Sequence, residues 1–160
     1  MTSGKSITIE LTDGLTVDFD AVNRGTYAAL NGIRLTAIGE GFVQGEIDID
    51  SSLKNPNGYL HGGVSATLAD TLAIFGCVYF YRVTTVSTIN FNVSFLRPVK
   101  TGKITATGRI LSKGRNVSLW KVEVLDDSSH LVAEATVTVA ITGGGAINKN
   151  SGPTPKEPDS

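Results

Sequence analysis

An acidic side chain in the middle of a long apolar run is the feature of this sequence with the clearest chemical meaning. Asp70 is the only formally charged residue between Val64 and Tyr81, and its neighbours include Leu68 and Phe75. A carboxylate in such company loses hydration when it is buried, and that loss is costly unless hydrogen bonds replace the water. Ionisable groups held in apolar surroundings cluster at functional sites, so Asp70 is a candidate catalytic residue.

A pair of glycines just before the apolar run is the second candidate. His61 is followed by Gly62 and Gly63, and without side chains these positions let a ligand approach the backbone closely. The first N–H groups of a helix have no partners within the helix and lie at the positive end of its dipole. We expect them to form an oxyanion-type site for a polarised carbonyl.

The spacing of these two candidates keeps them apart within one chain. Asp70 follows Gly63 by seven residues, so the two share a face of the helix but stand roughly 10 Å apart along its axis. One carbonyl cannot easily contact both. Two helices packed antiparallel about a two-fold axis would bring the glycines of one copy to the carboxylate of the other. The geometry therefore predicts a homodimer with two composite sites.

The stretch that carries both candidates is expected to be one long helix, from His61 to Tyr81. Its apolar run of 18 residues from Val64 is also long enough to cross a bilayer. The charge of Asp70 near the middle argues against a membrane span. A buried core helix, with no membrane partner, is the better interpretation.

Alternating apolar residues predict two strands before this helix and four after it. The predicted strands are 33–39, 42–49, 85–96, 103–112, 117–125 and 131–141. Short, turn-rich connections favour antiparallel pairing, so the predicted fold class is α+β, with the long helix against a sheet of about six strands. The helix is apolar on nearly all sides, so a partner subunit would cover the face that the sheet leaves open.

The chain is interpreted as one domain with two flanking segments. Residues 1–32 are an N-terminal extension with a short helix over 19–30, residues 33–142 are the domain, and 143–160 are a disordered tail rich in Gly, Pro and Ser. A net charge of -1 with scattered Lys and Arg offers no surface for nucleic acid. A single cysteine and the lack of an apolar N-terminal stretch favour a cytoplasmic location.

Other reactive side chains do not suggest a second site. His61, His130 and Cys77 are too few to form a metal cluster, so neither a metal nor another cofactor is expected. Cys77 lies in the apolar run and is expected to be a core residue, because apolar surroundings raise the pKa of a thiol.

Residues 55–71, NPNGYLHGGVSATLADT, resemble the signature of hotdog-fold acyl-CoA thioesterases, in particular the phenylacetate-pathway (PaaI-like) group. The similarity covers roughly 33–141 and includes the segment NVSFLRP at 92–98. The resemblance implies a hotdog fold, a long helix wrapped by an antiparallel sheet, in dimers that commonly pair into tetramers. It also implies hydrolysis of an acyl-CoA thioester without a metal, with coenzyme A as part of the substrate.

The resemblance further implies roles for individual residues. The Gly62 N–H would polarise the thioester carbonyl, and Gly63 would allow its close approach. Asp70 from the partner subunit would be the general base that activates water, or the nucleophile that forms an anhydride. Asn55 matches an Asn or Gln that orients the water or the thioester. Thr88 matches a hydroxyl position used for water in some relatives.

Residues around the reacting centre are expected to hold it and to bind coenzyme A. His61 is expected to act through backbone and capping contacts. Basic side chains near the mouth of the pocket would anchor the phosphates, and the candidates are Arg97, Lys100, Lys113 and Arg115. Apolar candidates for the acyl pocket suit an aryl or a short to medium-chain acyl group, and they are Leu60, Leu68, Ile74, Phe75, Phe80 and Phe91.

Two other functions remain compatible with the same fold. A dehydratase or hydratase acting on an acyl thioester would need a His with an acid in a different arrangement, and only His61 is near enough in the sequence to partner Asp70. A non-enzymatic acyl-CoA-binding protein is the other alternative. The presence of both Asn55 and Asp70 favours the thioesterase.

Overall fold

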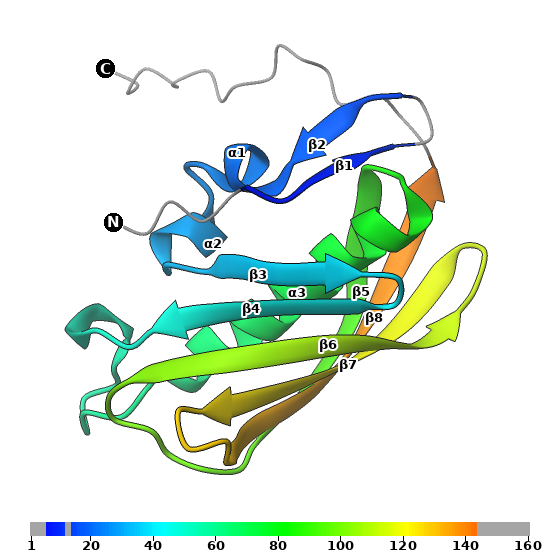
Figure 1. Cartoon of the computed structure of the whole chain (residues 1–160). Helices are drawn as coiled ribbons and strands as arrows, with labels where there is room; N and C mark the ends of the chain where they lie inside the picture. The colour runs from blue at the N-terminus through cyan, green and yellow to red at the C-terminus, as the bar shows by residue number, and fades with distance from the viewer. Residues whose placement is uncertain (1–5, 12–13, 144–160) are drawn as a thin grey trace, which may run out of the picture.

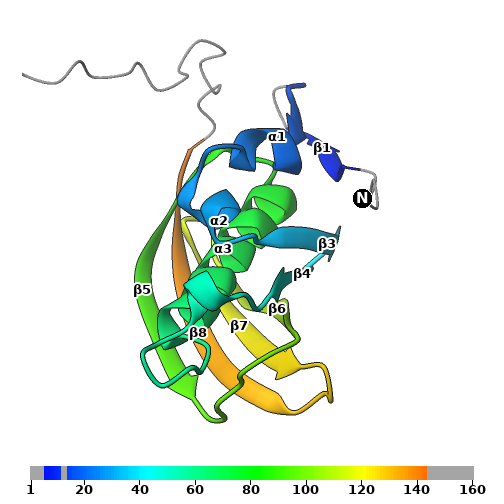
Figure 2. The same ribbon diagram turned by 90° about the vertical axis from the view of Figure 1, so that its left-hand side faces the viewer.

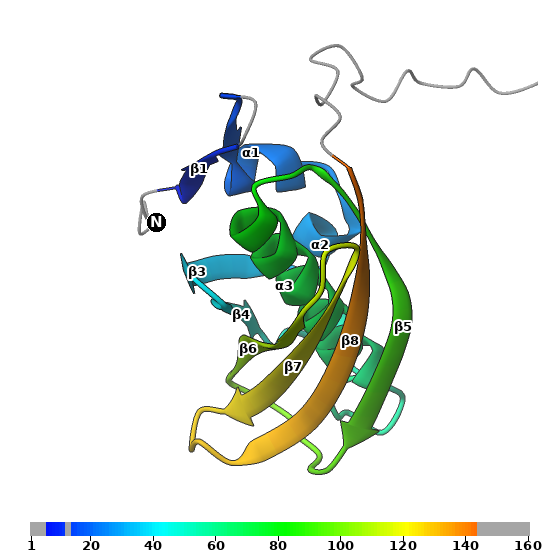
Figure 3. The same cartoon turned by 90° about the vertical axis from the view of Figure 1, so that its right-hand side faces the viewer.

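A long helix lying in the concave side of a curved sheet forms the centre of the molecule (Figure 1, Figure 3). The structure, a computed structural model, describes residues 6–11 and 14–143. The helix is α3 (Gly62–Tyr81), and the six strands of the sheet have the order β3-β4-β6-β7-β8-β5, with every neighbouring pair antiparallel. The predicted α+β architecture is confirmed.

The strands of this sheet follow the predicted ranges to within two residues at each end. They are β3 (Arg34–Gly39), β4 (Phe42–Asp48), β5 (Thr85–Phe95), β6 (Lys103–Lys113), β7 (Val117–Asp126) and β8 (Leu131–Gly143). A short 3-10 helix, η1 (Ser51–Leu53), lies between β4 and α3. Strands β3 and β5 form the two edges of the sheet. Of the predicted tail 143–160, only Gly143 lies within the described residues.

Helix α3 is the buried core helix that the sequence predicts. It starts after His61, whose Nδ1 accepts a hydrogen bond from Gly63 N–H, and it ends at Arg82, which adopts a left-handed conformation with φ 56°. By length and composition α3 could span a membrane, but half of its most apolar stretch is buried within the fold. At Gly76 a Cβ atom would lie 2.6 Å from the Trp120 ring, so the glycine lets the indole pack directly on the helix.

The N-terminal extension differs from the prediction of one short helix over 19–30. The structure has two helices, α1 (Phe19–Asn23) and α2 (Tyr27–Leu30), preceded by a small sheet of β1 (Thr8–Glu10) and β2 (Thr16–Asp18). The helix breaks because Arg24 is extended and Gly25 has a φ of 74°. The hydroxyl of Thr26 then accepts a hydrogen bond from Ala29 N–H and caps α2.

A second apolar cluster fastens this extension to the C-terminal half of α3. Its buried members are Ile9, Leu11, Val17, Phe19 and Val78. The Phe19 ring packs edge-on against Phe75 of α3, with ring centroids 4.9 Å apart. The extension therefore places α2 beside α3, on the side that faces β5 (Figure 2, Figure 3).

Candidate active site

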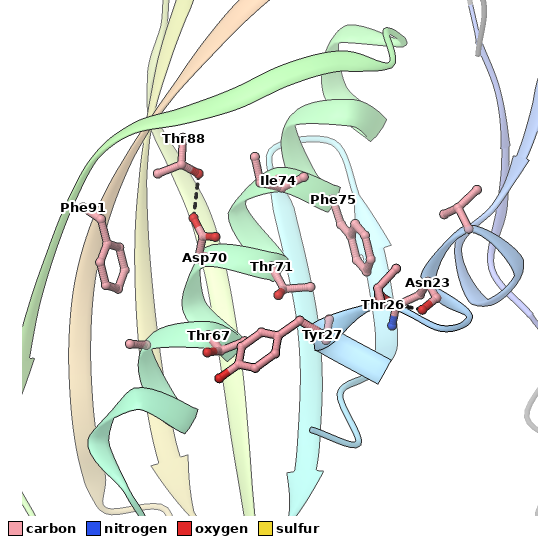
Figure 4. A pocket seen from close by; sticks show the side chains of 13 residues that line it. Asn23, Thr26, Tyr27, Thr67, Asp70, Thr71, Ile74, Phe75, Thr88 and Phe91 are labelled. Carbon is pink, nitrogen blue, oxygen red and sulfur yellow. Dashed lines mark hydrogen bonds between the residues drawn. The ribbon is translucent and has the colours of Figure 1, made fainter. Parts of the chain in front are cut away.

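The Asp70 carboxylate projects from the middle of α3 and is held by a threonine of β5. Thr88 Oγ1 donates a hydrogen bond of 2.6 Å to Asp70 Oδ1 (Figure 4). Hydrogen bonds to an ionised acceptor are short and strong, so this contact fixes the orientation of the carboxylate. Among the described residues no second hydrogen bond reaches the Asp70 side chain, which leaves Oδ2 available to water or substrate. Both residues are half-buried.

The pairing of β5 with β8 is irregular at the point where Thr88 meets Asp70. The register shifts between Thr88 and Asn90, within an otherwise continuous antiparallel pair. Such bulges bend a strand and re-aim a side chain, and they are frequent beside active sites. The irregularity therefore gives β5 a local reason to point this hydroxyl at the helix.

Asp70 lines an open hollow of about 630 Å³ between α2, α3 and β5. The surface of the hollow is mostly apolar, with Ile74 and Phe75 from the helix and Phe91 from the strand. These three match the sequence-based candidates for an acyl pocket. An acyl group bound here would lie beside the carboxylate.

A second hollow, of about 390 Å³, lies at the start of α3. It is lined by Asn55, Gly62, Phe95 and Arg97, among others. The predicted capping contact of His61 is present and occupies the Gly63 N–H, whereas among the described residues no acceptor contacts the Gly62 N–H. Gly62 thus offers a helix-start donor to a carbonyl oxygen.

The Phe95 ring leaves little room for a side chain at Gly62. A Cβ atom built at this position would lie 3.0 Å from the Phe95 ring. The missing side chain therefore leaves the space through which a carbonyl oxygen would reach the N–H.

Asn55 holds the loop that leads into α3. Its Oδ1 accepts hydrogen bonds from the N–H groups of Asn57 and Tyr59, at 3.0 and 3.2 Å. The loop is also tied to the sheet side of the molecule, because Leu60 N–H donates to Val99 O at 2.7 Å. Within one protomer the side-chain oxygen of Asn55 therefore holds the backbone of the loop that borders the Gly62 hollow.

The two hollows share no lining residue within one protomer. Eight residues of helix separate Gly62 from Asp70, which is about 12 Å along the axis. The structure thus brings Asp70 together with Thr88, and Asn55 together with Gly62, but leaves the two pairs apart.

The basic residues proposed for coenzyme A are divided between two ends of the molecule. Arg97 lines the Gly62 hollow, and Lys100 Nζ lies 4.7 Å from the ring centroid of Tyr59, which lines the same hollow. Lys113 Nζ instead lies 4.9 Å from the centroid of Phe80, in the last turn of α3. Arg115 lines a different hollow with Asn116, Ile141 and Thr142. The structure does not bring the four cations to one place.

Two of the predicted acyl-pocket residues do not line either of these hollows. Leu68 is completely buried in the main core, because it lies on the sheet-facing side of α3. Phe80 packs edge-on against Tyr81, with centroids 4.9 Å apart. Leu60 lines the Gly62 hollow and not the Asp70 hollow.

Sequence reasoning missed the contribution of the N-terminal extension to the Asp70 hollow. Asn23, Thr26 and Tyr27 all line it. The helical spacing of Val22 and Tyr27 indicated an amphipathic segment, but only the tertiary packing shows what that segment covers.

The remaining reactive side chains lie elsewhere in the described part of the chain. His130 Nδ1 lies 3.3 Å from Asp126 Oδ2 in the turn between β7 and β8. Cys77 is buried, and burial raises the pKa of its thiol while a contact with Ser118 opposes that rise. Within residues 6–11 and 14–143, no group of three His, Cys, Asp or Glu side chains is placed to hold a metal ion.

A long helix wrapped by a six-stranded antiparallel sheet is the architecture of the hotdog class. The thioesterase superfamily model matches residues 57–133. The chain is 30% identical over 125 residues to the proofreading thioesterase EntH of Klebsiella pneumoniae, covering 78% of this chain and 91% of that protein. It is 28% identical over 126 residues to the 1,4-dihydroxy-2-naphthoyl-CoA hydrolase of Escherichia coli, covering 76% and 90%.

A solved structure of a thioesterase is also similar to this chain. The thioesterase HI1161 of Haemophilus influenzae is similar with a TM-score of 0.74 and 26% identity, covering 82% of this chain and 94% of that one. The chain belongs to the thioesterase superfamily and has the hotdog fold. It is a thioester hydrolase, as its sequence predicts.

Proposed function

We propose that the protein hydrolyses an acyl-CoA with an aryl or a short to medium-chain acyl group, giving the free acid and coenzyme A. The observation that carries the proposal is the Asp70 carboxylate, held by Thr88 in a mostly apolar hollow. The similarity to a hydrolase named for an aromatic acyl-CoA supports the substrate class.

Two copies of the chain would complete the active site. Gly62 and Asp70 lie in separate hollows of one protomer, and an antiparallel arrangement of two α3 helices would oppose them. Strand β5 is an edge of the sheet, and the apolar side chains of Ile89, Phe95 and Leu96 are more than half exposed along and just beyond it. The unpaired backbone N–H and C=O groups of such an edge can form hydrogen bonds with a second copy of the chain. A dimer of dimers is the assembly we propose.

Hydrolysis follows from the two halves of this composite site. The carbonyl oxygen of the thioester accepts a hydrogen bond from Gly62 N–H of one protomer, which stabilises the negative charge that develops there. Asp70 of the other protomer takes a proton from water as the water oxygen bonds to the carbonyl carbon. The carbon–sulfur bond then breaks, and the leaving thiolate receives the proton from Asp70.

A second route uses the same groups. The Asp70 carboxylate bonds directly to the carbonyl carbon and the thiolate of coenzyme A leaves, which forms a mixed anhydride. Water then hydrolyses the anhydride and restores Asp70. After a single turnover in ¹⁸O-labelled water, label in Asp70 identifies the second route, because water that attacks the aspartyl carbon of the anhydride leaves its oxygen there.

The other residues of the Gly62 end would hold the substrate. Asn55 orients the thioester or the water, and Gly63 leaves room beside Gly62. Arg97 and Lys100, which lie at this end, would contact the phosphates of coenzyme A. The reaction as written needs no metal or other cofactor. We also propose that the protein has no nucleic-acid partner, because its charge is near neutral and its Lys and Arg residues are scattered. The single cysteine supports the proposal of a cytoplasmic location.

The geometry at the two histidines favours hydrolysis over dehydration. A dehydratase needs an imidazole that works together with an acid. His61 Nδ1 accepts the Gly63 N–H. The His130–Asp126 pair is exposed at the turn between β7 and β8 and lines neither hollow. Neither ring contacts Asp70 within a protomer.

The test is thiol release from acetyl-, hexanoyl-, lauroyl- and phenylacetyl-CoA by the wild type and by Asp70→Asn. We expect the wild type to hydrolyse some of these substrates and the variant to lose about a hundredfold or more in kcat while it stays folded. Cys77 is buried, so the folded protein should add little to the colour of a thiol reagent. An inactive wild type, or a fully active variant, would contradict the proposal.

A further inference from the structure

We infer that the α1–α2 segment, Phe19–Leu30, is the wall that selects the acyl group, and that Tyr27 is its main selecting residue. This inference deepens the proposed function and rests on it. It concerns residues that precede the stretch matched by the thioesterase superfamily model, 57–133.

The first observation is the composition of the Asp70 hollow. Five of the residues that line it come from the α1–α2 segment, namely Val22, Asn23, Thr26, Tyr27 and Ala28. The helix α3 and strand β5 supply the rest. The segment is therefore one complete side of the space in which the acyl group would lie.

The second observation is that this side is held in place before any substrate binds. The Phe19–Phe75 ring contact anchors α1 on α3. At the junction of the two short helices, Thr26 Oγ1 lies 2.6 Å from the carbonyl oxygen of Asn23 and 2.8 Å from its Oδ1. A wall whose polar groups already bond to one another can select by shape, because little ordering is left for the substrate to induce.

The third observation is the placement of Tyr27. Its ring reaches from α2 across Thr67 of α3, while Phe91 stands on the other side of Asp70 (Figure 4). The Tyr27 side chain is 67% exposed in the protomer although it lines a hollow that is mostly apolar. An acyl group between these two rings would bury part of that aromatic surface.

Together these observations give the direction of the selection. We expect a flat aryl group or a short chain to lie between Tyr27 and Phe91, which both line the hollow. A long chain would extend past the ring of Tyr27, because this residue lines the hollow and is 67% exposed, which places it at the border of the hollow. Removing the ring should therefore favour long acyl chains relative to aryl groups.

The test compares Tyr27→Ala, Tyr27→Phe and Leu30→Ala in the full chain. Leu30 is the matched control, because it lies on the same short helix, is 81% exposed and does not line the hollow. For each protein the ratio of kcat/KM for phenylacetyl-CoA to that for lauroyl-CoA is measured. Dissociation constants are measured by calorimetry for two thioether analogues that cannot be hydrolysed, S-phenethyl-CoA and S-dodecyl-CoA.

We expect Tyr27→Ala to lower this kcat/KM ratio about tenfold and to raise the ratio of the S-phenethyl-CoA to the S-dodecyl-CoA dissociation constant by about the same factor. Tyr27→Phe should keep both ratios, and Leu30→Ala should leave them unchanged. The inference would be overturned if the ratios do not change in Tyr27→Ala, or if they change equally in Leu30→Ala. It would also be overturned if a changed oligomeric state of Tyr27→Ala accounts for the change in its ratios. If the wild type binds both analogues but hydrolyses no thioester, the proposed function fails. The ratio of dissociation constants then still decides whether Tyr27 selects the acyl group.

Discussion

The two hollows along α3 are built in opposite ways. The Asp70 hollow is made by residues from three regions that are far apart in the sequence, the α1–α2 segment, α3 and β5. The Gly62 hollow lies between the loop that leads into α3 and the end of β5 with the connection that follows it. The backbone of that loop is fixed by its own side chains, since Asn55 and His61 each accept hydrogen bonds from nearby N–H groups. One hollow presents a carboxylate and the other a backbone donor.

This difference shows how the fold separates two tasks. A donor at a helix start needs a rigid backbone and an open approach, which glycine and a tight loop supply. A carboxylate beside an acyl group needs a shaped apolar space, which only packed elements supply. Each hollow holds half of what a thioester hydrolase requires, so the comparison predicts that changes in the two hollows affect different steps.

The largest effect in the Gly62 hollow is expected for Gly62→Ala. The added methyl group would stand beside the N–H and 3.0 Å from the Phe95 ring, so the carbonyl oxygen could no longer approach. We expect kcat/KM to fall about 100- to 1,000-fold, the range for losing an oxyanion donor. The double variant Gly62→Ala, Phe95→Leu relieves the contact with the ring, and it should remain slow. Full recovery in the double variant would mean that the ring contact, and not the N–H, matters.

A smaller effect is expected in the Asp70 hollow for Thr88→Val. The change keeps the shape of the side chain but removes the 2.6 Å hydrogen bond to Asp70. We expect kcat to fall about tenfold, because the carboxylate loses its fixed orientation. Thr88→Ser, which keeps the hydroxyl, should stay within about threefold of the wild type. Equal rates for the valine and serine variants would show that this hydrogen bond does not contribute to turnover.

The smallest effect on chemistry, with the clearest effect on stability, is expected for Asn55→Ala. The variant loses the two hydrogen bonds that Oδ1 accepts from Asn57 and Tyr59, and we expect the free energy of unfolding to fall by about 1–2 kcal/mol. Urea unfolding gives this value. Asn55→Asp keeps an acceptor and should recover most of the loss. An Asn55→Ala variant as stable as the wild type would contradict the role of Asn55 in holding the loop.

The contrast between the hollows also explains which features the sequence revealed. The six strands and α3 could be predicted because apolar periodicity and turn residues mark them directly. Asp70 and Gly62 could be found because an isolated charge and a double glycine stand out in an apolar run. Tyr27 could not, because its role arises from the packing of the extension on α3. The three-residue strands β1 and β2 carried too little pattern to be recognised.

The basic residues could have been separated from the sequence. Arg97 and Lys113 are both cations in predicted connections, yet the fold places Arg97 beside Gly62 and Lys113 over Phe80 near the end of α3. These connections precede and follow β6 and therefore lie at opposite ends of that strand. Grouping the cations by charge alone overlooked the strand predicted between them.

The most direct test of the composite site is the activity of a mixed dimer. One chain carries Asp70→Asn and the other Gly62→Ala, each with its own affinity tag, and tandem purification isolates the mixed species. If each site takes Gly62 from one protomer and Asp70 from the other, one of the two sites is intact and activity should return to about half of the wild type. Control dimers in which both chains carry the same variant, prepared with the same two tags, should remain slow. A mixed dimer as slow as its parents would show that Gly62 and Asp70 act within the same protomer and would contradict the account.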